Sequence, residues 1–179
     1  MMHDHSTDKA DWPDIVVESL RVHRLEIISY VPDVVTWKVL SKLEADPDFK
    51  VVPAAREDEA IGIVAGAYAA RKKGAVFMQS SGFGNCVNAL GTLCIPYRIP
   101  IPMFISVRGG LGEFNMAQIP MGKAVAPILD VMGLQHFTPT RKDELQPIVN
   151  GAIDLCYSGR LPVGLLLPTI LTGGKRGTS

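Results

Sequence analysis

Residues 56–88, REDEAIGIVAGAYAARKKGAVFMQSSGFGNCVN, join an acidic cluster, an alanine- and glycine-rich segment, a short apolar run and a Ser/Gly-rich loop. The small-residue segment at 57–73 is predicted to be a helix that Gly74 ends, and the apolar run at 75–79 is predicted to be a buried strand. In an α/β sheet this order places the carboxylates and the loop 80–85 at one edge. We therefore expect this edge to carry the chemistry of the chain.

The rest of the chain continues the alternation of helix and strand. This alternation indicates an α/β fold, a Rossmann-like three-layer domain with a six-stranded, mostly parallel sheet that helices cover on both faces. We expect one domain at residues 13–170, between an N-terminal tail at 1–12 and a C-terminal tail at 171–179. The remaining strands are expected at 25–31, 49–53, 100–107, 135–138 and 161–167, and the remaining helices at about 13–24, 33–43, 122–132 and 143–158, with one more ending near residue 93.

The composition of the 179-residue chain is that of a globular protein without a strong charge. Hydrophobic residues make up 47% of the chain and charged residues 20%, and the formal net charge is zero. Without a basic field, binding to nucleic acid or to an anionic membrane is not expected. No apolar run has the length of a membrane span or the pattern of a signal peptide. The three cysteines lack metal-ligand spacing and indicate reduced thiols in a cytoplasmic protein.

Several motifs have both a structural and a functional interpretation. Gly82 and Gly84 resemble the start of a dinucleotide fingerprint, but Val87 holds the third glycine position and no acidic residue follows about 20 positions later. The loop is therefore either a tight turn or a ligand-binding loop. The acids at 57–59 either favour the helix dipole or include a catalytic carboxylate. Arg108, beside a second glycine-rich loop, is either an anion clamp or a surface residue.

The N-terminal residues His3, Asp4 and His5 could hold a metal ion. A tail is the more common structure for a polar segment at the end of a chain. We therefore expect no metal site there.

The combination of motifs is more specific than its parts. A glutamate after the second strand precedes Gly66-Ala67-Tyr68, the helix-ending Gly74, an apolar strand and a Ser-Gly-x-Gly-Asn loop, with Asn88 further on. This pattern resembles the pyrimidine-binding domain of thiamine-diphosphate-dependent decarboxylases, and in detail the phosphonopyruvate and sulfopyruvate decarboxylase branch. Within that branch it is most similar to the α subunit of two-subunit enzymes, over residues 17–167. The phrases that carry the similarity are Val31-Pro32-Asp33, residues 78–85, Val107-Arg108-Gly109-Gly110 and Pro120-Met121-Gly122-Lys123.

The resemblance implies that Glu57 is the cofactor-activating glutamate of the family. Its carboxyl group would hydrogen-bond the pyrimidine ring of thiamine diphosphate and prepare the cofactor for attack on a 2-oxo acid. The spacing to Gly66-Ala67-Tyr68 favours Glu57 over Asp58 and Glu59. The resemblance also implies that the loop lines the cofactor through Ser81, Gly82, Phe83, Gly84 and Asn85.

One part of the family pattern is missing from the chain. The family binds the diphosphate and Mg²⁺ with a Gly-Asp-Gly motif and a later Asn-Asn pair, and neither occurs in this sequence. The resemblance therefore implies a hetero-oligomer in which a β subunit carries the diphosphate-binding domain and the metal. No metal site is expected on this chain.

The implied reaction is the decarboxylation of a 2-oxo acid with an anionic tail. The first expectation is the conversion of sulfopyruvate to sulfoacetaldehyde and CO2, and phosphonopyruvate or another 2-oxo acid is the alternative. A non-catalytic Rossmann-like binding module is a further alternative, which would need neither Glu57 nor the intact loop. An anionic tail is bound by a cation and hydrogen-bond donors. Substrate contacts are expected at Asp33, Arg108, Gln118 and Lys123.

Overall fold

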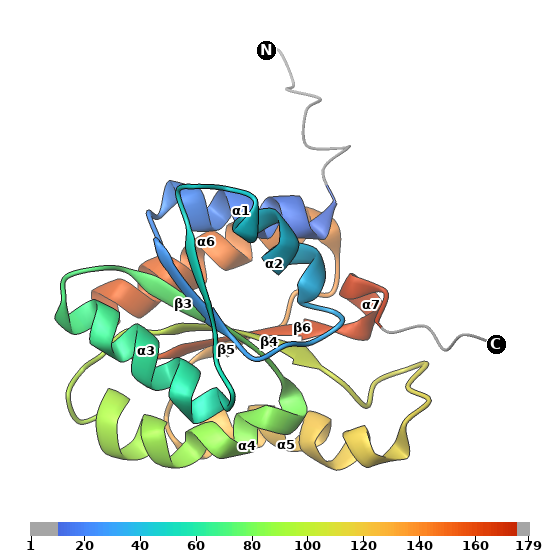
Figure 1. Ribbon diagram of the computed structural model, residues 1–179. Helices are drawn as coiled ribbons and strands as arrows, with labels where there is room; N and C mark the ends of the chain where they lie inside the picture. Colours follow the sequence, from blue (N-terminus) through green and yellow to red (C-terminus); the bar gives the residue numbers. More distant parts are fainter. Residues whose placement is uncertain (1–10, 175–179) are drawn as a thin grey trace.

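The computed structural model describes residues 11–174, in which helices cover both faces of a parallel sheet (Figure 1). The six strands lie in the order β2-β1-β3-β4-β6-β5, and every pair of neighbours is parallel. The predicted α/β, Rossmann-like three-layer fold is confirmed. The strands are β1 Ile27–Tyr30, β2 Lys50–Pro53, β3 Gly74–Gln79, β4 Pro102–Val107, β5 His136–Phe137 and β6 Val163–Pro168.

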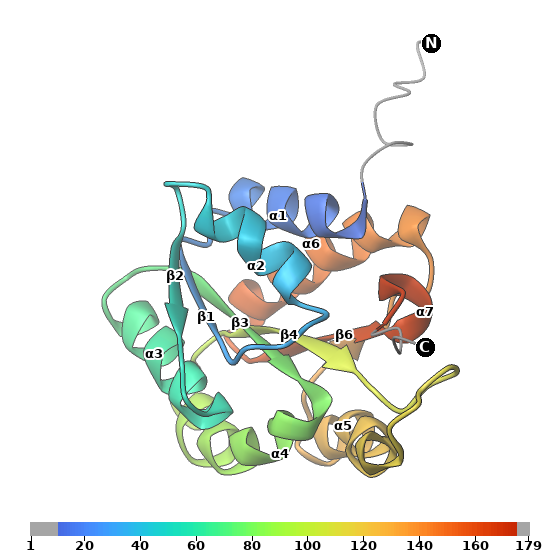
Figure 2. The ribbon, with the colours of Figure 1, turned by 45° about the vertical axis from the view of Figure 1, so that its right-hand side comes forward.

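Two helical layers enclose the sheet (Figure 2). Helices α1, α2 and α6 lie on one face, over a core that includes Leu20, Leu40 and Ile153. Helices α3, α4 and α5 lie on the other face, over a core that includes Ile61 and Phe83. The helices are α1 Trp12–Val22, α2 Trp37–Glu44, α3 Glu57–Ala69, α4 Ser80–Ala89, the π-helix η1 Leu90–Cys94, the 3-10 helix η2 Met116–Gln118, α5 Ile119–Val131, α6 Lys142–Gly159 and α7 Thr169–Thr172.

The central strands are continuous apolar runs because both of their faces are covered. In β3, β4 and β6 the first five residues are buried, as expected for parallel strands between two helical layers. Phe77 and Phe104 stack across β3 and β4 with ring centroids 4.6 Å apart. The parallel register brings the carboxyl ends of these strands to one edge of the sheet, where ligands bind in such folds.

Both ends of the domain differ from the predicted limits. Asp11 caps α1 and Trp12 is 3% exposed. These two residues, which were expected in the N-terminal tail, therefore belong to the folded domain. Helix α7 continues to Thr172, which is buried, so the expected C-terminal tail begins too early by at least two residues. The rest of the two tails, residues 1–10 with His3, Asp4 and His5, and residues 175–179, lies outside the described residues.

Candidate active site

The predicted site residues come from segments that the sheet brings to its carboxyl edge (Figure 2). Asp33 follows β1, and Glu57 opens α3 soon after β2. Helix α4 starts at Ser80, directly after β3, and Arg108 directly follows β4. The edge thus combines residues that are far apart in the sequence.

Glu57 differs from the two acids that follow it. Asp58 pairs with Arg56 at 3.0 Å, and Glu59 accepts a backbone amide at 2.7 Å, so both stabilise the start of α3. Glu57 is only 9% exposed, and its Oε2 accepts a 2.9 Å hydrogen bond from Nδ2 of Asn85. Within residues 11–174, its Oε1 receives no hydrogen bond from the protein. Glu57 is therefore the one buried acid of this cluster, and its Oε1 can accept or share a proton with a ligand.

The Ser/Gly stretch, predicted to be a loop, forms the first turns of α4. Gln79 is both the last residue of β3 and the extended N-cap of α4, so no connecting loop separates strand from helix. Phe83 is fully buried in the core. Helical geometry turns the side chain of Phe83 inward, so this side chain packs in the core and does not line the carboxyl edge of the sheet. Ser81, Gly84 and Asn85 are exposed.

Two glycines of this stretch permit close packing and do not form a turn. A Cβ at Gly82 would lie 1.7 Å from Oε1 and 2.0 Å from Cδ of Glu57, so the carboxyl group occupies the space of a side chain at position 82. A Cβ at Gly84 would lie 3.2 Å from Cε of Met121 in α5. Neither glycine has a positive φ. The glycine pattern therefore reflects contacts made by α4.

Asp33 accepts hydrogen bonds from three segments. Its Oδ1 accepts from Nε2 of Gln79 at 2.9 Å, and its Oδ2 accepts from Oγ of Ser106 at 2.7 Å and from the amide of Thr36 at 3.2 Å. Gln79 in turn accepts from Oγ of Ser81 at 2.7 Å. Asp33 therefore connects the carboxyl ends of β1, β3 and β4. Helix α2 begins at Trp37 and not near residue 33 as predicted, because residues 34–36 form a turn.

Arg108, considered as an anion clamp, is paired within the chain. Its Nε and Nη2 each donate a 2.7 Å hydrogen bond to Glu113, and the two side chains are 7% and 2% exposed. Glu113 also accepts the amides of Gly109 at 3.1 Å and Asn115 at 3.0 Å. These donors, with Arg108 the most important, lower the pKa of Glu113 to about 2. Glu113 in turn raises the pKa of Arg108.

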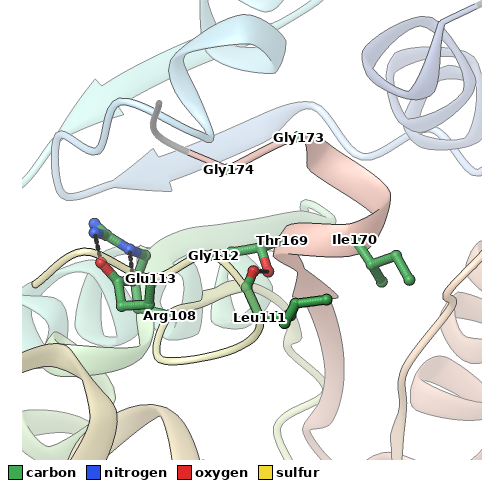
Figure 3. Close-up of a pocket in the computed structure, with 8 residues that line it drawn as sticks. All are labelled: Arg108, Leu111, Gly112, Glu113, Thr169, Ile170, Gly173 and Gly174. Atoms are coloured by element: carbon green, nitrogen blue, oxygen red, sulfur yellow. Dashed lines mark hydrogen bonds and ion pairs between the residues drawn. The ribbon is translucent and has the colours of Figure 1, made fainter. Parts of the chain in front are cut away.

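A cavity of about 160 Å³ lies beside this ion pair (Figure 3). The loop after β4 forms one wall, and α7 with the glycines after it forms the other. Oγ1 of Thr169 donates a 3.3 Å hydrogen bond to the carbonyl of Leu111, which joins the two walls. The cavity is lined by Arg108, Leu111, Gly112, Glu113, Thr169, Ile170, Gly173 and Gly174.

The other two predicted substrate residues lie near the start of α5. Gln118 is the N-cap of α5, and its Oε1 is buried without a hydrogen-bond partner in the described structure. Lys123 is exposed on α5. A Cβ at Gly122 would lie 1.7 Å from the carbonyl oxygen of Arg108, so this helix packs directly on the loop after β4. The structure thus brings the beginning of α5 to Arg108, and no described contact joins Lys123 to another site residue.

Sequence reasoning missed Gln79, Ser106, Glu113 and Thr169. Gln79 and Ser106 lie in the last two residues of β3 and β4, a position that is itself a signal, because strand ends meet at the binding edge. Glu113 carried a weaker signal as an acid five residues after Arg108 in the same loop. Thr169 was assigned to the end of the domain, although α7 places it in the cavity wall.

The described residues hold neither a cluster of metal ligands nor a membrane-spanning helix. In residues 11–174, no group of three or more His, Cys, Asp or Glu side chains is arranged to hold a metal ion. The three cysteines are free and buried, and burial raises the pKa of Cys94 to about 11. None of the helices described here is long and apolar enough to cross a membrane.

Comparison with known proteins gives the relatives of the chain. No family model matches the sequence. The chain is 38% identical to the sulfopyruvate decarboxylase subunit alpha of Methanococcus maripaludis, over 82% of this chain and 87% of that protein. It is 37% identical to the same subunit of Methanocaldococcus jannaschii, over 87% of this chain and 92% of that protein. The chain belongs to the sulfopyruvate decarboxylase subunit alpha family. The resemblance noted in the sequence is thereby confirmed.

Longer proteins contain a region similar to this alpha-subunit chain. The sulfopyruvate decarboxylase of Methanosarcina acetivorans is 32% identical, over 69% of this chain and 32% of that protein. The phosphonopyruvate decarboxylase of Streptomyces viridochromogenes is 29% identical, over 79% of this chain and 36% of that protein. A solved 2-oxoglutarate:ferredoxin oxidoreductase from Magnetococcus marinus has a TM-score of 0.75 at 18% identity, over 91% of this chain and 29% of that chain. The structural likeness supports the fold.

Proposed function

We propose that this chain is the α subunit of a thiamine-diphosphate-dependent decarboxylase that converts sulfopyruvate to sulfoacetaldehyde and CO2. The observation that carries the proposal is the position, burial and hydrogen bonding of Glu57. This acid lies at the carboxyl edge of the sheet, is 9% exposed, and uses only one of its oxygens in a hydrogen bond within the described chain. The family of alpha subunits to which the chain belongs supports sulfopyruvate as the substrate.

The surroundings of Glu57 fit the aminopyrimidine end of thiamine diphosphate. The cofactor, when bound, supplies the electron sink that a 2-oxo acid needs to lose CO2. Glu57 would hold a proton at Oε1 and share it with a ring nitrogen, while Asn85 holds Oε2. The low exposure of the carboxyl group keeps water from competing, so this hydrogen bond is stronger than it would be in solution.

The diphosphate and Mg²⁺ are proposed to be bound by a second, β subunit. The sequence contains neither the Gly-Asp-Gly motif nor the Asn-Asn pair of the family. The relatives that match over 87% and 92% of their own length are named as alpha subunits. The M. acetivorans and S. viridochromogenes relatives are about three times as long as the region they share with this chain. Both observations support a hetero-oligomer in which two chains complete one site. The buried free thiols support a cytoplasmic location.

The anionic tail of the substrate is proposed to contact the start of α5. Asp33 and Arg108 are both engaged within the chain, as an acceptor of three hydrogen bonds and as the partner of Glu113. We therefore propose that Asp33 and Arg108 mainly stabilise the structure at the carboxyl edge of the sheet. Lys123 is an exposed cation. Gln118 can offer only its Nε2 amide as a donor, because its Oε1 is a buried acceptor without a partner in the described structure. Lys123 is therefore the better candidate for binding the anionic tail.

The proposal is tested by producing the chain together with the β subunit and measuring CO2 release. The purified complex is supplied with thiamine diphosphate and Mg²⁺, and sulfopyruvate, phosphonopyruvate and pyruvate are compared. We expect the highest kcat/KM with sulfopyruvate. Preference for phosphonopyruvate would retain the cofactor chemistry and change the substrate, which the S. viridochromogenes relative makes the second candidate. A saturated complex that releases no CO2 from any of the three acids would refute the proposal.

A further inference from the structure

Two residues on one face of α4 hold the carboxyl group of Glu57 from two sides. Gly82 and Asn85 are three positions apart, so their side-chain positions lie next to each other on the helix surface. The bare Cα of Gly82 leaves the space in which Oε1 of Glu57 lies, at 1.7 Å from where a Cβ would stand. Nδ2 of Asn85 donates to Oε2 at 2.9 Å. The two oxygens of Glu57 therefore have different environments.

This difference determines which oxygen can carry a proton. An amide N–H can donate to a carboxylate oxygen or to the carbonyl oxygen of a neutral carboxylic acid, but not toward an oxygen that itself points a proton at it. With its NH2 group turned toward Glu57, Asn85 keeps Oε2 as an acceptor in both charge states. In this arrangement a proton carried by Glu57 lies on Oε1.

We infer that Asn85 is a positioning residue that acts through Glu57. It keeps Oε2 occupied so that Oε1 gives and takes the proton exchanged with the bound cofactor. This inference rests on the proposed function, and it changes the role predicted for Asn85, from a residue that lines the cofactor to one that orients the activating acid. It also gives the Gly-x-x-Asn spacing a physical reason, since both positions are needed to seat one carboxyl group.

A neutral donor is the group type that this role requires. An aspartate at position 85 would place a second carboxylate beside Glu57, and like charges that share a site raise the pKa of one of them strongly. The other ionisable groups that sense the charge of Glu57 are Arg56, which neighbours it at the start of α3, and Cys86 on α4. Burial, followed by the charges of Glu57 and Asp58, raises the pKa of the Cys86 thiol, so this group stays neutral. Asn85 is thus the direct partner that controls the carboxyl group.

The first test follows the carboxyl group of Glu57 in the full chain, without cofactor or partner. Carboxyl carbon NMR is recorded for the wild type, Asn85→Ala and Asn85→Asp, and the Glu57 signal is assigned by its loss in Glu57→Gln. We expect the Glu57 carboxyl signal, compared at one neutral pH, to move in both Asn85 variants, because each removes the hydrogen bond that Nδ2 of Asn85 donates to Oε2. An unchanged signal in both variants would overturn the inference. Asn85→Asp has nearly the shape of asparagine and covers the case in which Asn85→Ala does not fold.

The second test separates orientation from cofactor binding in the two-subunit complex. Thiamine diphosphate affinity is measured by calorimetry in the presence of Mg²⁺, and the pH dependence of kcat is measured with sulfopyruvate. For Asn85→Ala we expect kcat to fall about 10- to 100-fold, the scale of a perturbed proton-transfer group, with cofactor affinity changed less than about threefold. Gln146→Ala, which removes an exposed amide from α6 in the opposite helical layer, should leave both values unchanged.

The outcomes distinguish this inference from the function on which it rests. Lack of turnover in the wild-type complex counts against the proposed function, whereas the NMR comparison still decides whether Asn85 holds the carboxyl group of Glu57. An active wild type in which Asn85→Ala loses cofactor affinity and kcat in parallel shows that Asn85 binds the cofactor directly, and it refutes the positioning role. A wild-type kcat in Asn85→Ala refutes it as well.

Discussion

Glu113 holds Arg108 through two 2.7 Å hydrogen bonds and also accepts the backbone amides of Gly109 and Asn115. One carboxylate therefore closes the whole loop after β4. Gly109 has a φ of +82°, and a Cβ there would lie 2.7 Å from Cα of Ile119, so the closed loop packs directly on the start of α5. The position of α5 at the candidate site thus depends on the ion pair.

Replacement of Glu113 by alanine is expected to destabilise the fold. The change leaves the guanidinium of Arg108 in a nearly inaccessible position without its partner, and breaking a buried pair in this way costs about 3 kcal/mol or more. Urea unfolding of the full chain measures the loss. Glu18→Ala removes one of the two carboxylate partners of Arg21, in a pair whose side chains are 52% and 44% exposed, and should have a much smaller effect. Equal losses of unfolding free energy in the two variants would show that the buried contacts of Glu113 stabilise the fold no more than an exposed pair does.

The Arg108–Glu113 pair is expected to make the free energy of unfolding depend on pH in the acidic range. In the folded chain the pKa of Glu113 is lowered from 4.5 to about 2 by its donors. Because the folded pKa is the lower one, the stabilisation is complete above pH 4.5 and is lost as the pH falls from 4.5 toward 2. Unfolding free energies of the wild type and Glu113→Gln, measured across this range, should therefore converge at the acid end. Parallel curves would contradict the assignment.

The fold was predictable because the hydrophobic pattern of the sequence indicates its helices and strands. The start of α4 was not predictable. Short continuous apolar runs such as β3 and β4, each six residues long, favour strands that are covered on both faces. Glycines at 82 and 84 have two physical uses, a turn or a close contact, and the local sequence does not distinguish them. Here the contacts are with Glu57 and Met121, residues that tertiary structure alone brings near. A helix that follows a strand without a loop was therefore assigned as a loop.

The sequence predicted which positions form the site better than it predicted the contacts among them. Local reasoning left the acids at 57–59 equivalent, and only the resemblance selected Glu57. The structure distinguishes them by their partners, since Asp58 binds Arg56 and Glu59 accepts the backbone amide of Ala55. The pairing of Arg108 with Glu113 depends on the conformation of an irregular loop, which has no sequence period to reveal it.

Glu57→Gln is expected to abolish most of the activity and leave the assembly intact. Glutamine can still accept the hydrogen bond from Asn85, so the local structure is kept, but it cannot exchange a proton with the cofactor. We expect kcat to fall by about 100-fold or more, measured as CO2 release by the two-subunit complex. Glu59→Gln, two residues further along the same helix start, serves as the matched control and should retain activity. Wild-type rates in Glu57→Gln would remove Glu57 from the mechanism.

Gly82→Ala is expected to displace the carboxyl group of Glu57. The new methyl group would lie 1.7 Å from Oε1, so the side chain of Glu57 must turn away. Misplacement of a catalytic group by about 1 Å can cost on the order of 100-fold in rate, and we expect kcat to fall at least tenfold on this basis. Gly91→Ala, where a Cβ meets only Cε of Met132 at 3.8 Å, should behave like the wild type. Full activity in Gly82→Ala would show that Glu57 is not fixed by this contact.

Helix α3 is expected to contact the β subunit through its small exposed residues. Gly66 is exposed, and a Cβ there meets no atom within 4 Å, so a leucine fits the isolated chain and removes a helix-interior glycine that costs about 1 kcal/mol. Gly66→Leu should therefore keep or raise the unfolding free energy of the chain and weaken binding of the β subunit, measured by calorimetry or co-purification. Gly151→Leu makes the same change at an equally open position on α6, in the opposite helical layer, and should leave binding unaffected. If both variants bind the β subunit like the wild type, the interface lies on another surface, because a side chain of this size cannot be accommodated where two helices pack closely.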